Sequence, residues 1–345
     1  MFVWSPELDA LVPPRRGQGA DVVTRQMGRV RLFRSALKAR AVGYEPRDSL
    51  VRLMRTGDGA LADEADAFLL ACSAPRRGTG VGKISGLSEV EAAKVACAGV
   101  DRWVQLRGIA RAVEIFSLLG AWLPVPLFPD DQPRVLAALR LRQWLAHADA
   151  DADADAVAFV TTWDGLPHGM LGWRTSTGYD AGREAIAYLF PDHPPFFARA
   201  ADELRAHGAR SSLLLGAVAS VDDHDRVADL VGDADLDRNA LVIARELRDA
   251  GQARLITHAH RAARGLPRSF QTVPGIVHAL SAHVSPEAAR ALALFVEHRA
   301  AHPVLRRYFE AHPALEQAAA DLLDIRDRRS GARVWRRGMA PLTHA

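Results

Sequence analysis

A short acidic cluster and a later histidine are the residues whose types most suggest catalytic chemistry. Asp222, Asp223, His224 and Asp225 are consecutive, and His258 follows further along the chain. Imidazole nitrogens and carboxylate oxygens are common ligands of zinc and other transition metals. Asp222, His224, Asp225 and His258 therefore form one hypothetical metal site, which would belong to an all-helical metal-dependent hydrolase.

The positions of these residues nevertheless favour a simpler interpretation. His224 and Asp225 fall in an acidic turn after residues 217–221, where acidic side chains commonly cap the next helix. His258 and His260 would point about 200° apart on a helix, so they would not converge on one ion. We therefore expect helix caps and surface histidines here, and we predict no metal or other cofactor.

A basic helix near the N-terminus is a second candidate site. Arg25 and Arg29 lie on one flank of its apolar stripe, and Arg31, Arg34 and Lys38 lie on the other. Such a helix could bind nucleic acid or another anionic surface. The simpler interpretation is that these long side chains extend along the edge of a packed helix while their charged ends stay in water. Binding to an anionic surface therefore stays an alternative hypothesis.

Other motifs of known enzymes are incomplete. Residues 77–85 resemble a phosphate-binding loop, but Arg77 replaces the first required glycine and Ile84 replaces the serine or threonine that binds magnesium. The chain contains no Gly-x-Ser-x-Gly elbow. Its two cysteines, Cys72 and Cys97, are too few for a disulfide framework or a cysteine-based zinc site. These observations favour a protein that is not an enzyme.

Composition limits the partners and the location of the protein. Of the 44 basic residues only three are lysines, but the 41 acidic residues leave a formal net charge of only +3. This charge is low for a nucleic-acid-binding protein. The most apolar stretch, residues 113–128, contains Glu114, Pro124 and Pro126 and is too interrupted to span a membrane. We expect a protein of the reducing cytoplasm.

The elements that would position these residues are predicted to be helices. Alanine, the best helix former, occurs 62 times in the 345 residues. Ser285 is expected to cap a helix that begins at Pro286. Pro194, Pro303 and Pro313 each follow a histidine and are expected in the first turn of a helix. The sequence therefore predicts an all-α fold.

The low-complexity run of alternating alanine and aspartate suggests where the chain divides. We expect an N-terminal helical region over residues 1–148, an Ala/Asp linker over 149–156, a repeat region over 157–325 and a basic tail over 326–345. Likely helix starts recur at short intervals after about residue 180, and pairs of such helices are typical of helical repeat proteins.

Three segments carry a resemblance to a known family. They are Ala185–Pro191, Leu213–Val218 and the two His-Pro helices that begin near 302 and 312. The region 181–323 resembles the alanine-rich repeats of HEAT-like proteins, especially the repeat region of large bacterial WGR/MolR-type proteins. The resemblance implies an irregular α-solenoid of short antiparallel helix pairs. Stacked helices of this kind usually bind other proteins, and the sequence holds no complete enzyme motif. We therefore expect a non-enzymatic scaffold that binds another protein in the bacterial cytoplasm.

Overall fold

The fold is all-α, as the sequence predicts, in the part of the chain that the structure describes. A computed structural model describes residues 1–9, 12–17, 22, 89–122, 132–164, 181–208, 213–265 and 274–330. Helices, turns and bends make up most of these residues, and an isolated antiparallel bridge joins Phe2 and His283. The chain divides into two compact units. Unit 1 comprises Met1–Val12 and Val218–Ala345, and unit 2 comprises Pro13–Ala217.

Unit 2 is built from helices that pack on near neighbours in the sequence. Its described helices are α5 (Glu89–Arg107), α6 (Ile109–Trp122), α7 (Gln132–Ala146), α8 (Ala150–Asp164), α9 (Ala181–Leu189), α10 (Pro194–Ala206) and the 3-10 helix η1 (Leu214–Ala217). Helix α5 packs on α6 and α7, α6 on α7 and α8, α7 on α9, and α9 on α10. Each helix thus meets the next helix or the next but one.

A buried ion pair holds α5 against α7 in unit 2. The carboxylate of Asp101 is fully buried and accepts two hydrogen bonds from Arg140, at 2.6 Å from Nε and 2.9 Å from Nη2. It also accepts a 2.9 Å hydrogen bond from the indole N–H of Trp144. A buried carboxylate needs such donors because its desolvation is costly. The pair therefore fixes the register of the two helices.

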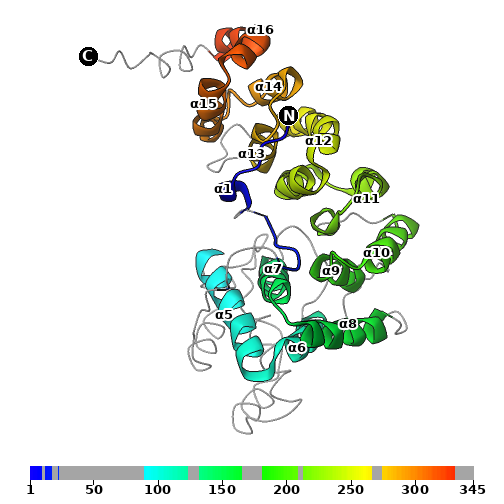
Figure 1. Cartoon of the computed structure of the whole chain (residues 1–345). Coiled ribbons are helices and arrows are strands. Elements are labelled where there is room, and N and C mark those ends of the chain that lie inside the picture. Colours follow the sequence, from blue (N-terminus) through cyan, green and yellow to red (C-terminus); the bar gives the residue numbers. More distant parts are fainter. Residues whose placement is uncertain are drawn as a thin grey trace, which may run out of the picture. The chain divides into compact units, whose positions relative to one another are not determined.

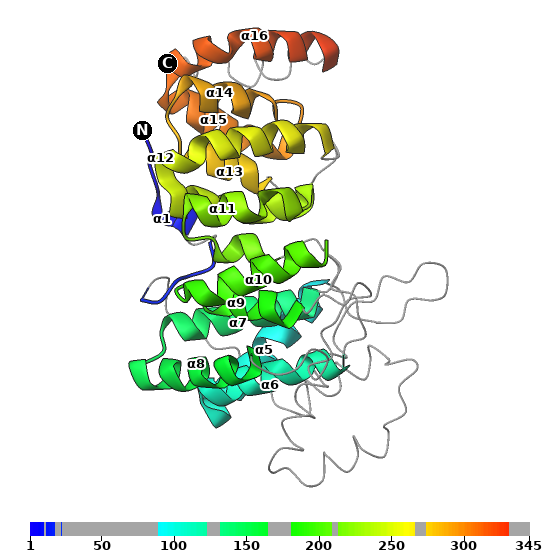
Figure 2. The same ribbon diagram turned by 90° about the vertical axis from the view of Figure 1, so that its right-hand side faces the viewer.

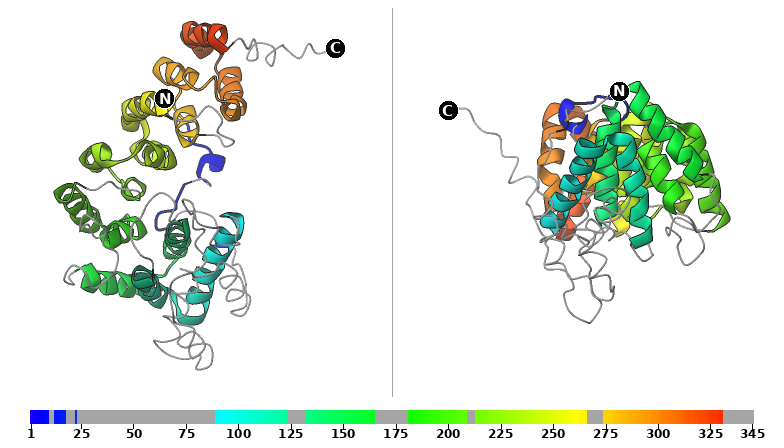
Figure 3. Two further views of the ribbon diagram at one scale, coloured as in Figure 1. Left: turned by 180° about the vertical axis from the view of Figure 1, so that it is seen from behind. Right: turned by 90° about the horizontal axis from the view of Figure 1, so that it is seen from below.

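Unit 1 has the same neighbour-to-neighbour packing. Its described elements are α1 (Pro6–Asp9), α11 (Val221–Val227), η2 (Ala228–Leu230), α12 (Asp233–Gly265), α13 (Gly275–Ser281), α14 (Pro286–Ala293), η3 (Arg299–Ala301), α15 (His302–Ala311) and α16 (Pro313–Ser330). Helices α12, α14 and α16 contact one another in turn and lie in successive layers (Figure 2). Helices α13 and α15 pack beside each other in a second row (Figure 1; Figure 3).

The helix starts predicted at Ser285 and at the prolines 194, 303 and 313 are confirmed. The hydroxyl of Ser285 caps α14 by accepting a 3.1 Å hydrogen bond from the Ala288 N–H, and Pro286 occupies the first turn. Pro194 and Pro303 lie in the first turns of α10 and α15, and Pro313 begins α16. Proline is tolerated there because its missing N–H would have had no partner within the helix.

Two predicted boundaries differ from the structure. Residues 149–156 were expected to form a linker, but Ala150–Asp164 is helix α8, and this segment lies inside unit 2. Alanine favours the helix, and the Asp149 carboxylate caps it by accepting a 2.8 Å hydrogen bond from the Ala152 N–H. The basic tail was expected from residue 326, but α16 continues to Ser330. Residues 331–345 lie outside the described residues.

The close approach of α13 to α12 requires a glycine. A Cβ atom on Gly275 would lie 2.2 Å from the carbonyl oxygen of Asp237, and the Asp237 carboxylate accepts a 3.0 Å hydrogen bond from the Ile276 N–H. Gly275→Ala should therefore force the two helices apart and lower the free energy of unfolding by about 1–3 kcal/mol. Denaturant titration followed by circular dichroism would measure this loss. An unchanged midpoint would contradict the close contact.

Candidate functional site

The structure brings two residues of the hypothetical metal site into direct contact inside unit 1. His224 on α11 and His258 on α12 are only 2% and 4% exposed, so the expectation of surface histidines is wrong for both. Their Nε2 atoms lie 2.9 Å apart. Residues 222–225 lie within helix α11 rather than in a turn, because Ser220 and Asp223 form a capping box that starts the helix earlier.

Asp225 supports His224 from the opposite side of the ring. Its carboxylate lies 2.9 Å from His224 Nδ1 and also accepts hydrogen bonds from the Nε and Nη2 atoms of Arg254. The bond from Arg254, followed by that from His224, holds the pKa of Asp225 well below its usual range. Because the ionised carboxylate can only accept, we assign the proton of neutral His224 to Nδ1. The Nε2 atom of His224 then accepts a hydrogen bond from the Nε2–H of His258.

The four residues of the hypothetical metal site do not surround one point. Asp222 is exposed, and Asp225 contacts the Nδ1 atom rather than the Nε2 atom that faces His258. Among the described residues, no group of three or more histidine, cysteine, aspartate and glutamate side chains could hold a metal ion. Burial, the main influence, lowers the pKa of His224, so the neutral hydrogen-bonded form is favoured.

A chelator experiment separates this histidine pair from a metal site. His258→Leu should lower the free energy of unfolding by about 1–3 kcal/mol, because it leaves a buried nitrogen of His224 without its donor. The loss should be the same with and without EDTA. His260→Leu, which changes an exposed residue of the same helix, is the matched control. A loss that disappears when EDTA is present would indicate a bound metal instead.

The basic helix predicted as a second site lies outside the described residues. This applies to Arg25, Arg29, Arg31, Arg34 and Lys38 alike. Binding through this helix stays a prediction.

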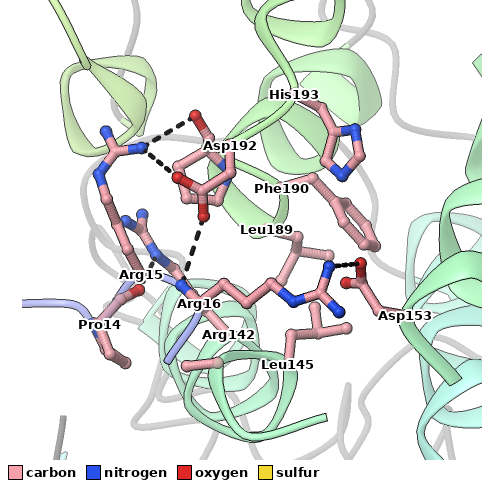
Figure 4. Close-up of a pocket in the computed structure, with 12 residues that line it drawn as sticks. Pro14, Arg15, Arg16, Arg142, Leu145, Asp153, Leu189, Phe190, Asp192 and His193 are labelled. Carbon is pink, nitrogen blue, oxygen red and sulfur yellow. Dashed lines mark hydrogen bonds and ion pairs between the residues drawn. The ribbon is translucent and has the colours of Figure 1, made fainter. Parts of the chain in front are cut away.

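Unit 2 contains a pocket that the sequence did not predict. We call it the arginine pocket; its volume is about 190 Å³. It lies among α7, α8, the turn between α9 and α10, and the segment that follows Val12 (Figure 4). Its lining residues are Pro14, Arg15, Arg16, Arg142, Leu145, Ala146, Asp153, Leu189, Phe190, Pro191, Asp192 and His193.

Arg142 anchors the wall of the arginine pocket. Its side chain projects from α7 and is 1% exposed. Its guanidinium donates to three backbone carbonyls, with distances of 2.8 Å to Pro14, 3.1 Å to Tyr188 and 2.6 Å to Gly216. It also lies 4.8 Å from the centre of the Tyr188 ring, within the range of a cation–π interaction. One side chain thus joins three segments that are distant in sequence.

Two ion pairs position the other arginines of the pocket. Arg15 donates to the Asp192 carboxylate at 2.7 Å and to the Pro191 carbonyl at 3.0 Å. Arg16 donates through Nη1 to Asp153 at 2.7 Å, and its backbone N–H donates to Asp192 at 3.3 Å. Figure 4 shows both ion pairs, with Arg16 extending past Leu145 and Leu189 towards Asp153. These contacts hold positive charge beside an apolar wall, which suits the binding of an anion.

Comparison with protein families, with curated proteins and with solved structures finds no match for this chain. None of the described helices has an apolar stretch long enough to cross a membrane. The part of the chain that the structure describes is all-α, and the chain divides into two compact units.

Proposed function

We propose that this protein is a non-enzymatic scaffold of the bacterial cytoplasm whose helices form an irregular, HEAT-like α-solenoid and bind another protein. The observation that supports this proposal most directly is the packing order within each unit. Helix pairs such as α12 and α14, or α5 and α7, are next-but-one neighbours in the sequence and contact each other. Stacking of this kind is typical of solenoid proteins, which use their extended surfaces for binding.

The His-Pro helices give the proposal a second support. Pro303 lies in the first turn of α15 and Pro313 begins α16, and these consecutive helices pack against each other. Two similar helix starts at a short interval are consistent with repeated helical units. The resemblance to the repeat region of WGR/MolR-type proteins rests on these helices and on the segments near α9 and η1.

Reciprocal co-purification tests the scaffold proposal. The protein is tagged in its native host, the enriched candidate is tagged in a second strain, and the purified pair is then mixed and analysed by size-exclusion chromatography with light scattering. We expect a complex of fixed stoichiometry that forms from the two purified proteins alone. Failure to reconstitute any pair would contradict the proposal.

A nuclease-treated sample provides the matching control. If the proposal holds, nuclease treatment and moderate salt should leave the complex intact. Recovery of nucleic acid whose binding falls steeply as salt rises would contradict the scaffold proposal and support the alternative that depends on the helix around Arg25 and Lys38.

A further inference from the structure

We propose that the arginine pocket binds a singly charged carboxylate that is joined to a small apolar group. This inference does not depend on the scaffold proposal, because it concerns the chemistry of one pocket in unit 2. It rests on three observations, which are the charge balance of the pocket, the unused donors of Arg16 and the apolar wall beside them.

The charge balance of the pocket favours a monoanion. Three guanidinium groups line it, from Arg15, Arg16 and Arg142, against the two carboxylates of Asp153 and Asp192. The residues that line the pocket therefore carry a net charge of +1 when His193 is neutral. A carboxylate carries one negative charge at neutral pH, whereas a phosphate monoester carries about 1.5 to 2. One carboxylate would neutralise the pocket, and a phosphate would leave it negative.

Arg16 supplies the donors for this carboxylate. Its guanidinium uses Nη1 to bind Asp153, and its Nε and Nη2 atoms make no hydrogen bond to any described residue. These two atoms form one edge of the planar group and match the two oxygens of a carboxylate. The Arg16 side chain is 47% exposed, so a ligand can reach it, while its ion pair with Asp153 holds it in place.

The apolar side chains that line the pocket fit an apolar group. Leu145, Leu189 and Phe190 line it, and each is less than 5% exposed. The volume of about 190 Å³ exceeds the roughly 150 Å³ of an engineered cavity that holds benzene. A branched chain of four or five carbons therefore fits beside the arginine. The same chemistry occurs in a free small acid and in the C-terminal residue of a polypeptide.

Calorimetric titration with two pairs of probes tests the proposal. The first pair is 4-methylpentanoate and its neutral amide, which have nearly the same shape. The second pair is the acetylated tetrapeptide Ala-Ala-Ala-Leu with a free or an amidated C-terminus. We expect at least one acid to bind and its amide to bind about 10-fold more weakly or not at all, as expected for loss of a charge-assisted hydrogen bond.

The two probe pairs also identify the source of the ligand. Binding of 4-methylpentanoate without binding of the peptide would indicate a free acid. Tighter binding of the peptide with the free C-terminus would indicate the end of a polypeptide. If neither acid binds, or if each acid binds no better than its amide, the proposal is wrong.

Substitution of Arg16 tests whether the acid binds at this residue. Arg16→Gln should weaken binding of the acid about 10-fold or more, and Arg16→Lys should weaken it less, because lysine keeps the charge but loses the planar edge. Arg205→Gln is the matched control, since Arg205 is exposed on α10 and does not line the pocket. Circular dichroism confirms that each variant is folded. Equal weakening by Arg16→Gln and Arg205→Gln would overturn the proposal.

Discussion

Replacing Arg142 by methionine should lower the free energy of unfolding by about 3–5 kcal/mol, one of the two largest effects we expect in this protein. Methionine fills a similar length of side chain but has no N–H donors. The carbonyls of Pro14, Tyr188 and Gly216 would therefore lose the hydrogen bonds that Arg142 donates to them. Because the guanidinium is 1% exposed, water does not readily replace those donors.

Two further variants separate the hydrogen bonds of Arg142 from its charge. Arg142→Lys keeps the charge but not the planar arrangement of donors, so we expect an intermediate loss. Arg205→Met removes an exposed arginine from α10 and should change stability by less than about 0.5 kcal/mol. Urea denaturation followed by circular dichroism gives all three values. If Arg142→Met costs no more than Arg205→Met, the three carbonyl contacts contribute nothing to stability.

Local sequence signals predict much of this fold. Ser285 and the prolines at 194, 303 and 313 mark helix starts because capping and proline geometry depend on a few adjacent residues. The same local reasoning also explains the error at residues 149–156. Alternating aspartates suggest a solvated linker, but alanine and the Asp149 cap are sufficient to start α8.

The arginine pocket could not be predicted in this way. Arg15 is separated from Asp192 by 177 residues, and Arg16 from Asp153 by 137 residues. Each arginine is an ordinary residue in its own neighbourhood, and only the folding of unit 2 places the three guanidinium groups around one space. The sequence shows two adjacent arginines in a loop, but it contains no signal for the carboxylates that they meet.

The sequence predicts part of the histidine pair, namely its residues but not their contacts. The sequence selects His224, Asp225 and His258 by residue type, and the structure connects all three. Residue type does not reveal which ring nitrogen faces which neighbour. The contact of Asp225 with Nδ1 and the contact between the two Nε2 atoms make a hydrogen-bonded chain, and residue type alone does not predict this geometry.

Another buried histidine, His283, is the basis of the other large expected effect. His283 is 0% exposed, and its ring lies 5.0 Å from the ring of Phe2 in unit 1. Neither of its ring nitrogens has a hydrogen-bond partner among the described residues. Its carbonyl accepts a 2.9 Å hydrogen bond from Tyr308, whose pKa burial raises to about 12. The surroundings of the His283 ring therefore offer little stabilisation to a charge.

Burial is the main cause that lowers the pKa of His283 from 6.5 to about 4, and the nearby Asp249 carboxylate only partly offsets it. Because the folded protein binds this proton less readily than the unfolded chain, the unfolded chain gains stability as pH falls. The contribution of neutral His283 to the free energy of unfolding is complete above pH 6.5. It is lost as the pH falls from 6.5 to about 4. A shift of this size corresponds to about 3 kcal/mol.

His283→Leu should remove this part of the acid sensitivity. We expect the stability of the variant relative to the natural chain to be constant above pH 7 and to rise by about 3 kcal/mol by pH 4, because leucine is uncharged at every pH. Denaturant titrations at a series of pH values measure the difference and cancel the groups that both proteins share. His260→Leu, at an exposed position of α12, is the control. A difference that does not change with pH would mean that His283 takes up its proton without cost, and hence that its ring is not enclosed beneath Phe2.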